Sequence, residues 1–224
     1  MGVHLPRWVW VGAGALACIA GMVNAVGFLG FEHQAITHLT GTTTQLGAAI
    51  AHGDVRASLQ LAGVALAFLL GAAASGMIVQ DATLRLGRRY GIALSLESVL
   101  LFTAVAAFRQ HQAFGAFLAA GACGLQNAMA TTYSGAVVRT THLSGMFTDL
   151  GIGLGHAVRG LPLQKRRLML CGLIVGMFFT GGLAGALLFG RWGTDALVVP
   201  ASLTGVVGVG YAVYRHTIIA GTVE

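Results

Sequence analysis

The chain contains one motif twice, as THLTGTTTQLGAAIAH at Thr37–His52 and as THLSGMFTDLGIGLGH at Thr141–His156. Eight of the sixteen aligned positions are identical. A shorter repeat precedes each copy, since Gly21-x-x-Asn24-Ala25 recurs as Gly124-x-x-Asn127-Ala128. Such recurrence at a fixed spacing indicates two related halves. We therefore expect a single domain over residues 1–224, with repeat 1 at about 8–108 and repeat 2 at about 113–214.

The composition places this chain in a membrane. Hydrophobic residues make up 56% of it and charged residues only 9%, which are too few charges to cover a water-soluble protein of this size. The net charge of +6 does not indicate a nucleic-acid partner, because the basic residues lie mostly in short breaks between apolar runs. The three cysteines fall inside apolar runs and show no disulfide or zinc spacing, so we expect packing roles and no metal or cofactor.

Six apolar stretches are long enough to cross a hydrocarbon core of about 30 Å, which takes roughly 20 helical residues. We expect an all-α, multi-pass protein with six transmembrane helices. They are approximately Trp8–Gly30, Ala57–Gln80, Tyr90–Phe108, Ala113–Gly135, Leu168–Gly190 and Ala196–Tyr214.

The basic residues predict the orientation of these spans. With six spans, ten of the thirteen Lys and Arg residues fall on one side, which the positive-inside rule assigns to the cytoplasm together with both termini. If both motif segments also crossed fully, the split would be eight against five. The six-span count places only Arg56, Arg109 and Arg191 outside.

A repeat of three spans has an odd number of crossings, so the second half is expected upside down relative to the first. Transporters built in this way bind substrate near the midplane, between broken or re-entrant helices. The two motif segments suit that role because their Thr and Ser hydroxyls can satisfy backbone groups freed at a helix break. We predict two inverted three-helix repeats, each with a re-entrant or broken polar helix.

These motifs resemble the YoaK family of bacterial inner-membrane proteins, which is described as a domain of unknown function. The resemblance rests on HLTGTTTQLG after a G-x-x-N-A helix, on GLQNA, and on VRTTHLSGMFTDLG followed by a basic loop. It covers nearly the whole chain and implies a multi-pass protein of the bacterial inner (plasma) membrane. It implies no substrate.

Histidines recur at matching positions in the two motifs. His38 and His142 lie deep in the predicted membrane, where an ionisable group indicates function, although each could instead bind a carbonyl and hold the helix break in shape. His52 and His156 are interpreted as solvated helix ends. The spacing of seven places His38, Gln45 and His52 on one helical stripe, and likewise His142, Asp149 and His156.

Acidic residues are few within the predicted membrane segments. Asp149 replaces Gln45 of the first motif, so it is a candidate proton-coupling residue with His142 as a partner; the alternative is an ion pair with a fixed arginine such as Arg139. Glu97 is the second candidate, and the alternative for it is a hydrogen bond between helices.

Hydroxyls and carboxamides are the candidate substrate ligands. We expect helices that begin near Thr40 and Ser144 with hydroxyl N-caps, so that two helix N-termini would offer free N–H groups to an anion. In the alternative, the hydroxyls bond to their own helices and the amides join helices. The candidate substrate-binding residues are Asn24, His38, Thr40, Gly41, Thr44, Gln45, Gln126, Asn127, His142, Ser144, Gly145, Thr148 and Asp149.

Three functions remain open at this point. The first is a small transporter or channel for a small polar or anionic solute, with proton coupling as an option. The second is an intramembrane hydrolase that uses His38, His142 and Asp149 around a metal, or Ser144 as nucleophile, although neither H-E-x-x-H nor G-x-S-x-G occurs. The third is a structural membrane protein. The expected partners are the lipid bilayer and a small solute, and homo-oligomers are compatible with every option.

Overall fold

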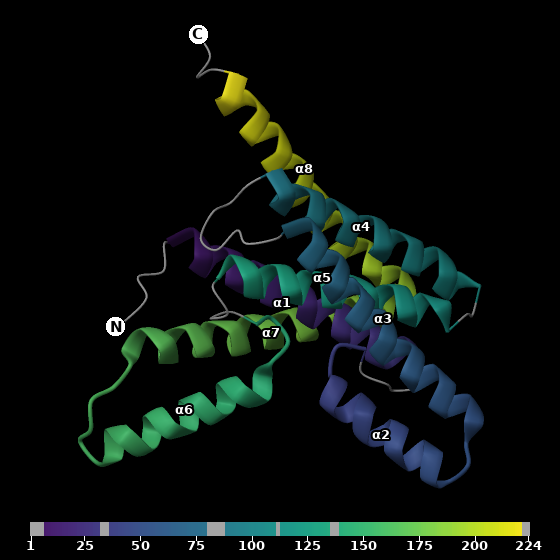
Figure 1. The fold of residues 1–224 in the computed structure, drawn as a ribbon, viewed down its shortest axis with the longest axis horizontal. Coiled ribbons are helices and arrows are strands. Elements are labelled where there is room, and N and C mark those ends of the chain that lie inside the picture. The colour runs from purple at the N-terminus through teal and green to yellow at the C-terminus, as the bar shows by residue number, and fades with distance from the viewer. Residues whose placement is uncertain (1–6, 32–35, 80–87, 111–112, 135–138, 221–224) are drawn as a thin grey trace.

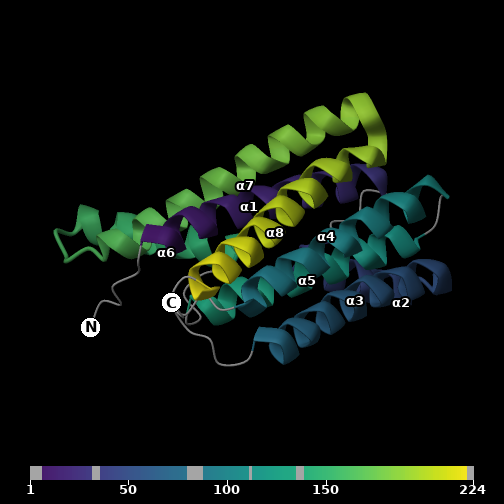
Figure 2. The same ribbon diagram turned by 90° about the horizontal axis from the view of Figure 1, so that it is seen from above.

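The computed structural model describes residues 7–31, 36–79, 88–110, 113–134 and 139–220, and it is helical throughout this part of the chain (Figure 1). Six long helices form the bundle, and two shorter ones lie beside them (Figure 2). The elements are α1 (Arg7–Gly30), α2 (Leu39–Ala51), α3 (Val55–Val79), α4 (Arg88–Arg109), α5 (Phe114–Tyr133), α6 (Leu143–Val158), α7 (Lys165–Trp192), the 3₁₀ helix η1 (Gly193–Leu197) and α8 (Val198–Ala220). α7 runs roughly along the long axis of the molecule, whereas α3 and α8 are inclined to it (Figure 1).

The two motif segments form the short helices, and each folds back on the long helix that follows it. α2 packs on α3 and α6 packs on α7, as two antiparallel hairpins. The turns contain Gly53 with φ 70° and Gly160 with φ 66°, a left-handed conformation that glycine adopts without strain. At 1.5 Å per residue, α2 and α6 are about 20 and 24 Å long, too short to cross a hydrocarbon core of about 30 Å.

Close helix crossings join the two halves through glycines. α1 packs on α7, α3 packs on α5, and α4 packs on α8. A Cβ on Gly21 of α1 would overlap the carbonyl oxygen of Phe178 on α7, and a Cβ on Gly124 of α5 would overlap that of Phe68 on α3. Small residues at such crossings let helix backbones approach closely, which is a typical mode of packing in lipid.

α5 is the most enclosed helix, and its small side chains contribute to both hydrophobic clusters of the core. By contrast, one face of α3 and one face of α7 are exposed and apolar. The exposed side chains on these faces include Leu66, Leu69, Leu70, Phe179, Leu183 and Leu187. A surface of this kind is suited to lipid contact.

Four stretches in the described part of the chain are long and apolar enough to cross a membrane, judged by length and composition. α5 is not among them, because Gln126 and Asn127 make it more polar. The chain therefore has the character of a multi-pass membrane protein. The four stretches are Val9–Gly30, Val55–Val79, Arg89–Arg109 and Lys165–Tyr211, the last of which contains α7, η1 and the first part of α8.

The predicted all-α class is confirmed, and each of the six predicted stretches contains a long helix. Most boundaries differ by one to three residues, and α8 ends at Ala220 rather than Tyr214. α7 begins at Lys165 rather than Leu168, and α8 begins at Val198 because η1, which starts at Gly193 with φ 57°, precedes it. The predicted ends at Gln80 and Gly135 lie outside the described residues.

Candidate functional site

Each short helix begins with a histidine that packs over a glycine. His38 and His142 are the residues before the first turn of α2 and α6, with φ/ψ of −100°/71° and −94°/58°. A Cβ on Gly41 would lie 2.8 Å from Nδ1 of His38, and a Cβ on Gly145 would lie 2.5 Å from the His142 ring. The repeated T-H-L-x-G sequence is therefore explained by a ring that occupies the space above the glycine.

The prediction of hydroxyl N-caps at Thr40 and Ser144 is wrong. The N-cap residues are His38 and His142, and neither side chain caps its helix. One turn later the hydroxyls of Thr44 and Thr148 bond to their own helices: Thr44 donates to the backbone carbonyl of Thr40, and Thr148 donates to that of Ser144, each over 3.0 Å. This bonding matches the alternative, and it leaves the first-turn N–H groups without a cap from the His side chains.

An asparagine holds the segment that leads into each short helix. Thr37 donates its hydroxyl to Oδ1 of Asn24 on α1 over 2.6 Å, and its backbone N–H contacts the same oxygen at 3.3 Å. In the second half the hydroxyl of Thr140 approaches Oδ1 of Asn127 on α5 at 3.5 Å. The starts of α2 and α6 are thereby fixed beside the interiors of two long helices.

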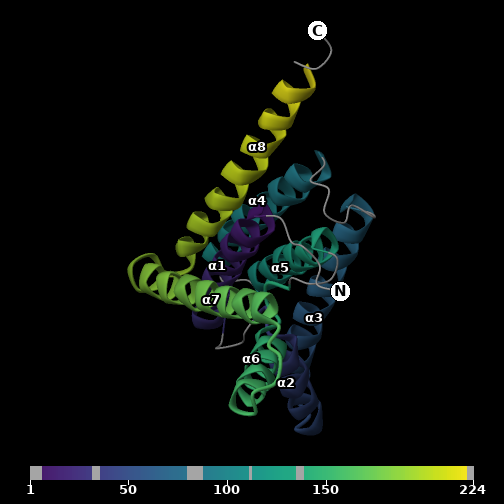
Figure 3. The same ribbon diagram turned by 90° about the vertical axis from the view of Figure 1, so that its left-hand side faces the viewer.

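The starts of α2 and α6 face the middle of the molecule, and from there the two helices run in opposite directions (Figure 1). Both lie on the same side of the bundle, opposite to α8 (Figure 3). α2 packs on α3, and α6 packs on α7. Their remaining faces are exposed and carry polar side chains, among them His38, Thr40, Thr44, Gln45, His142, Ser144 and Thr148.

Asp149 forms an ion pair, as the alternative for this residue proposed, but its partner is Arg167 of α7 and not Arg139. The guanidinium donates from Nε to Oδ2 over 3.0 Å and from the terminal nitrogen to Oδ1 over 2.8 Å. The α6–α7 hairpin brings the two residues opposite each other. In the first repeat Gln45 stands at the position of Asp149. When Gly71 of α3 is aligned with Gly181 of α7, Ala57 stands at the position of Arg167. The first repeat therefore has no counterpart of this ion pair.

A second polar group lies in the core. Glu97, in the middle of α4, is 1% exposed, and its Oε1 accepts a hydrogen bond from Nε2 of Gln126 over 2.9 Å. Oε1 of Gln126 in turn accepts from the hydroxyl of Thr140 over 3.3 Å. Among the residues that the structure describes, Oε2 of Glu97 has no hydrogen-bond partner. Glu97 is thus a helix-to-helix partner, and the sequence signal for it was an acid and an amide within apolar helices.

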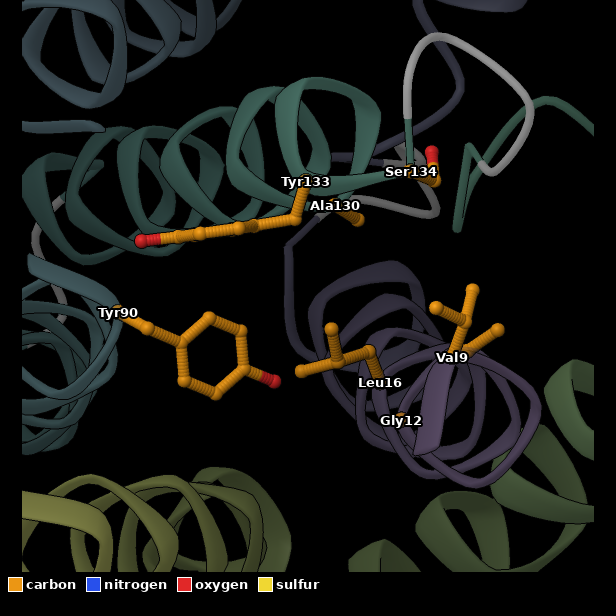
Figure 4. Close-up of a pocket in the computed structure, with 8 residues that line it drawn as sticks. Val9, Gly12, Leu16, Tyr90, Ala130, Tyr133 and Ser134 are labelled. Atoms are coloured by element: carbon orange, nitrogen blue, oxygen red, sulfur yellow. The ribbon is translucent and has the colours of Figure 1, made fainter. Parts of the chain in front are cut away.

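A shallow apolar pocket lies apart from these groups, between α1, α4 and α5 (Figure 4). Tyr90 and Tyr133 meet edge to face there, with ring centroids 5.1 Å apart. None of the candidate residues lines this pocket. Its lining residues are Val9, Gly12, Ala13, Leu16, Tyr90, Ala130, Tyr133 and Ser134.

The candidate residues therefore fall into separate groups. Gln126 donates directly to Glu97, and Thr140 contacts both Gln126 and Asn127. Asn24 accepts from Thr37, whereas Asp149 pairs with Arg167. Within the described ranges, no three His, Cys, Asp or Glu side chains come close enough to hold one metal ion. His52 and His156 are exposed near the ends of α2 and α6, as expected.

Comparison with known proteins agrees with the sequence resemblance to an uncharacterised family. Searches of curated proteins and of solved structures found no match. A family model described as "Protein of unknown function (DUF1275)" matches residues 12–210. This match covers most of the chain, including both motif copies and every candidate site residue, and the chain therefore belongs to the DUF1275 family of proteins of unknown function.

Proposed function

We propose that this chain is a small membrane carrier or channel for a small polar or anionic solute, built from two inverted three-helix repeats with six crossings. In this proposal α2 dips into the bilayer from one face and α6 from the other. The chain would reside in the bacterial inner membrane, as its resemblance to the YoaK family implies, with both termini in the cytoplasm.

The observation that carries the proposal is the opposed arrangement of the two short helices. α2 and α6 begin near the middle of the molecule and end toward opposite ends of its long axis (Figures 1 and 2). Arg109 at the end of α4 and Asp195 in η1 form an ion pair at 2.8 Å. This contact supports a common membrane face for the α4–α5 connection and the α7–α8 connection. This topology is the one that six crossings require.

The chemistry at the two helix starts favours an anionic or polar ligand. Helix N-termini carry a partial positive charge, and their first N–H groups lack intrahelical partners. Here each N-cap side chain, His38 or His142, leaves those groups uncapped, and exposed hydroxyls of Thr40 and Ser144 lie in the same turns. An anion binding there would gain backbone and hydroxyl donors without a fixed counter-charge.

Flux measurements test this proposal. The purified protein in liposomes would be offered a panel of small anions and neutral polar metabolites, with protein-free liposomes as reference. We expect uptake of at least one member, and we expect Thr40→Val and Ser144→Ala to reduce it about tenfold, the equivalent of about 1.4 kcal/mol. Thr103→Val is the matched control, because Thr103 is also an exposed helical threonine but lies on α4, where its hydroxyl donates to the carbonyl of Val99 over 2.8 Å.

Two results would count against a transport role at this place. One is an absence of uptake over protein-free liposomes for the whole panel. The other is uptake that Thr40→Val and Ser144→Ala leave at the level of Thr103→Val.

A further inference from the structure

The buried chain of hydrogen bonds from Glu97 through Gln126 to Thr140 connects three separate elements. Glu97 belongs to α4, Gln126 to α5, and Thr140 to the segment before α6, two residues ahead of His142. All three residues are at most 1% exposed. The two bonds measure 2.9 and 3.3 Å. A change at the carboxyl group can therefore reach the start of α6 through two contacts.

The fold does not need this polar chain, because the residues that the repeat aligns with its members form no such chain. The repeat aligns Gln126 with Val23 and Thr140 with Ile36, both buried in the hydrophobic core. It aligns Glu97 with Thr204, whose hydroxyl bonds to carbonyls of its own helix at 3.0 and 3.1 Å. One of these two related places thus contains a buried acid, whereas the other contains Val23 and Ile36 in the apolar core.

The surroundings of Glu97 suit a neutral carboxylic acid. Oε1 accepts a hydrogen bond from Gln126, and no side chain in the described part of the chain donates to Oε2. A buried carboxylate with so little compensation costs several kcal/mol, so it either acquires a proton or recruits donors. Asp149, in contrast, has a fixed and partly exposed cation at Arg167. We therefore assign the proton-linked role to Glu97 rather than to Asp149.

No basic side chain in the described part of the chain forms an ion pair with Glu97. The titratable groups close to it are the phenol of Tyr90 on α4 and the thiol of Cys123 on α5. Of the other elements packed on α4, α3 carries no titratable side chain after Arg56, η1 carries Asp195 paired with Arg109, and α8 presents Tyr211 against Tyr90.

We propose that Glu97 is a proton-binding site in the middle of the bundle, and that Gln126 and Thr140 transmit its protonation state to the start of α6. One proton from water is added to the carboxylate or released from the acid, and no other bond is broken. The charged form demands more donors, and those already in the chain are the amide of Gln126 and the hydroxyl of Thr140. When the Gln126 amide or the Thr140 hydroxyl turns toward the carboxylate, the hydrogen bond between Thr140 and Gln126, which holds residues 139–142, changes. The use of this site to couple proton and solute movement rests on the proposed transport function; the proton site itself does not.

The test titrates the full-length protein in lipid nanodiscs, with pH as the only variable and no solute. Infrared difference spectra should show a carboxylic-acid C=O band that changes with pH in the wild type and is lost in Glu97→Gln. Asp149→Asn should keep this band. Glu97→Gln retains the size of the side chain and an oxygen that accepts from Gln126, so a folded protein is expected, which a thermal melt would verify.

The transmission to α6 has its own readout. Hydrogen exchange of the peptide over residues 139–150, corrected for the intrinsic effect of pH, should depend on pH in the wild type. This dependence should be lost in Glu97→Gln and in Thr140→Val, whereas Thr204→Val, at the position that the repeat aligns with Glu97, should retain it.

Two results would overturn the inference. A pH-dependent band that persists in Glu97→Gln would show that the proton binds elsewhere. Exchange at residues 139–150 that follows pH equally in the wild type and in Thr140→Val would show that Glu97 does not act on α6. Neither readout depends on a transported solute, so a negative flux experiment together with a positive titration would refute the proposed function alone.

Discussion

Gly71 of α3 lies directly against the backbone carbonyl of Gly121 of α5, so a Cβ on Gly71 would overlap that oxygen. Gly181 of α7 lies in the same way against the carbonyl of Cys18 of α1. The repeat aligns Gly71 with Gly181 and Gly121 with Cys18. The two crossings that bind one half to the other are therefore equivalent contacts made once by each half.

Substitution of these glycines should separate close packing from helix propensity. We expect Gly71→Ala to destabilise the protein by about 1–3 kcal/mol, because backbone must move to admit the methyl group. Gly76→Ala on the same helix is the control, since its Cβ would meet nothing within 4 Å and alanine favours helices by about 0.5–1 kcal/mol. Thermal unfolding in detergent measures both. Equal melting temperatures for the two variants would contradict the close contact between Gly71 and the backbone of Gly121.

The segments that lead into α2 and α6 should respond to different threonines. Thr37→Val removes the 2.6 Å bond to Asn24 and should cost about 1 kcal/mol. Its aligned residue, Thr141, is not the one that reaches Asn127, so Thr141→Val should be nearly neutral while Thr140→Val is destabilising. Unfolding measurements on the three variants check the order. A large loss for Thr141→Val would argue against the described path of residues 139–142.

The ion pair of Asp149 and Arg167 should contribute little to stability. The side chains are 25% and 59% exposed, and pairs of this kind typically contribute about 0.2–1 kcal/mol. A double-mutant cycle with Asp149→Asn and Arg167→Gln should give a coupling in that range, which decreases as salt is added. A coupling near zero at low salt would mean that the two side chains do not meet.

Membrane topology provides an independent check on the charge count. Single cysteines at Arg109 and Thr194 should react with an impermeant thiol reagent from outside, and cysteines at Arg88 and Gln164 should react from the cytoplasm. The first two positions are expected to behave alike because Arg109 contacts Asp195, next to Thr194. Reaction of positions 88 and 109 from the same side would contradict six crossings.

Sequence reasoning located the helices but not the contacts between them. The lengths of the apolar runs predicted α1, α3, α4, α5, α7 and α8 to within a few residues, because a membrane helix must bury its backbone over a fixed thickness. The same apolar character hides which face of a helix meets which neighbour. The bond between Glu97 and Gln126 depends on the rotation of α4 and α5, which no period in these sequences encodes.

Local chemistry limited the prediction of the site as well. A threonine at a helix start suggests an N-cap, but its hydroxyl can equally bond to its own helix, as that of Thr44 does. Arg139 was named as an example of a fixed arginine for Asp149, whereas the hairpin turn at Gly160 brings Arg167 to it. The first error is one of local hydrogen bonding, and the second depends on which residues the turn after α6 brings opposite each other.

The central claim is that α2 and α6 start near the middle of the bilayer and open to opposite faces, and cysteine accessibility along the two helices tests it most directly. In a background without the native cysteines, an impermeant thiol reagent applied from outside should label position 48 readily and position 40 more slowly. Applied from the cytoplasm, it should label position 155 readily and position 144 more slowly. Labelling of positions 48 and 155 from the same face would contradict the account.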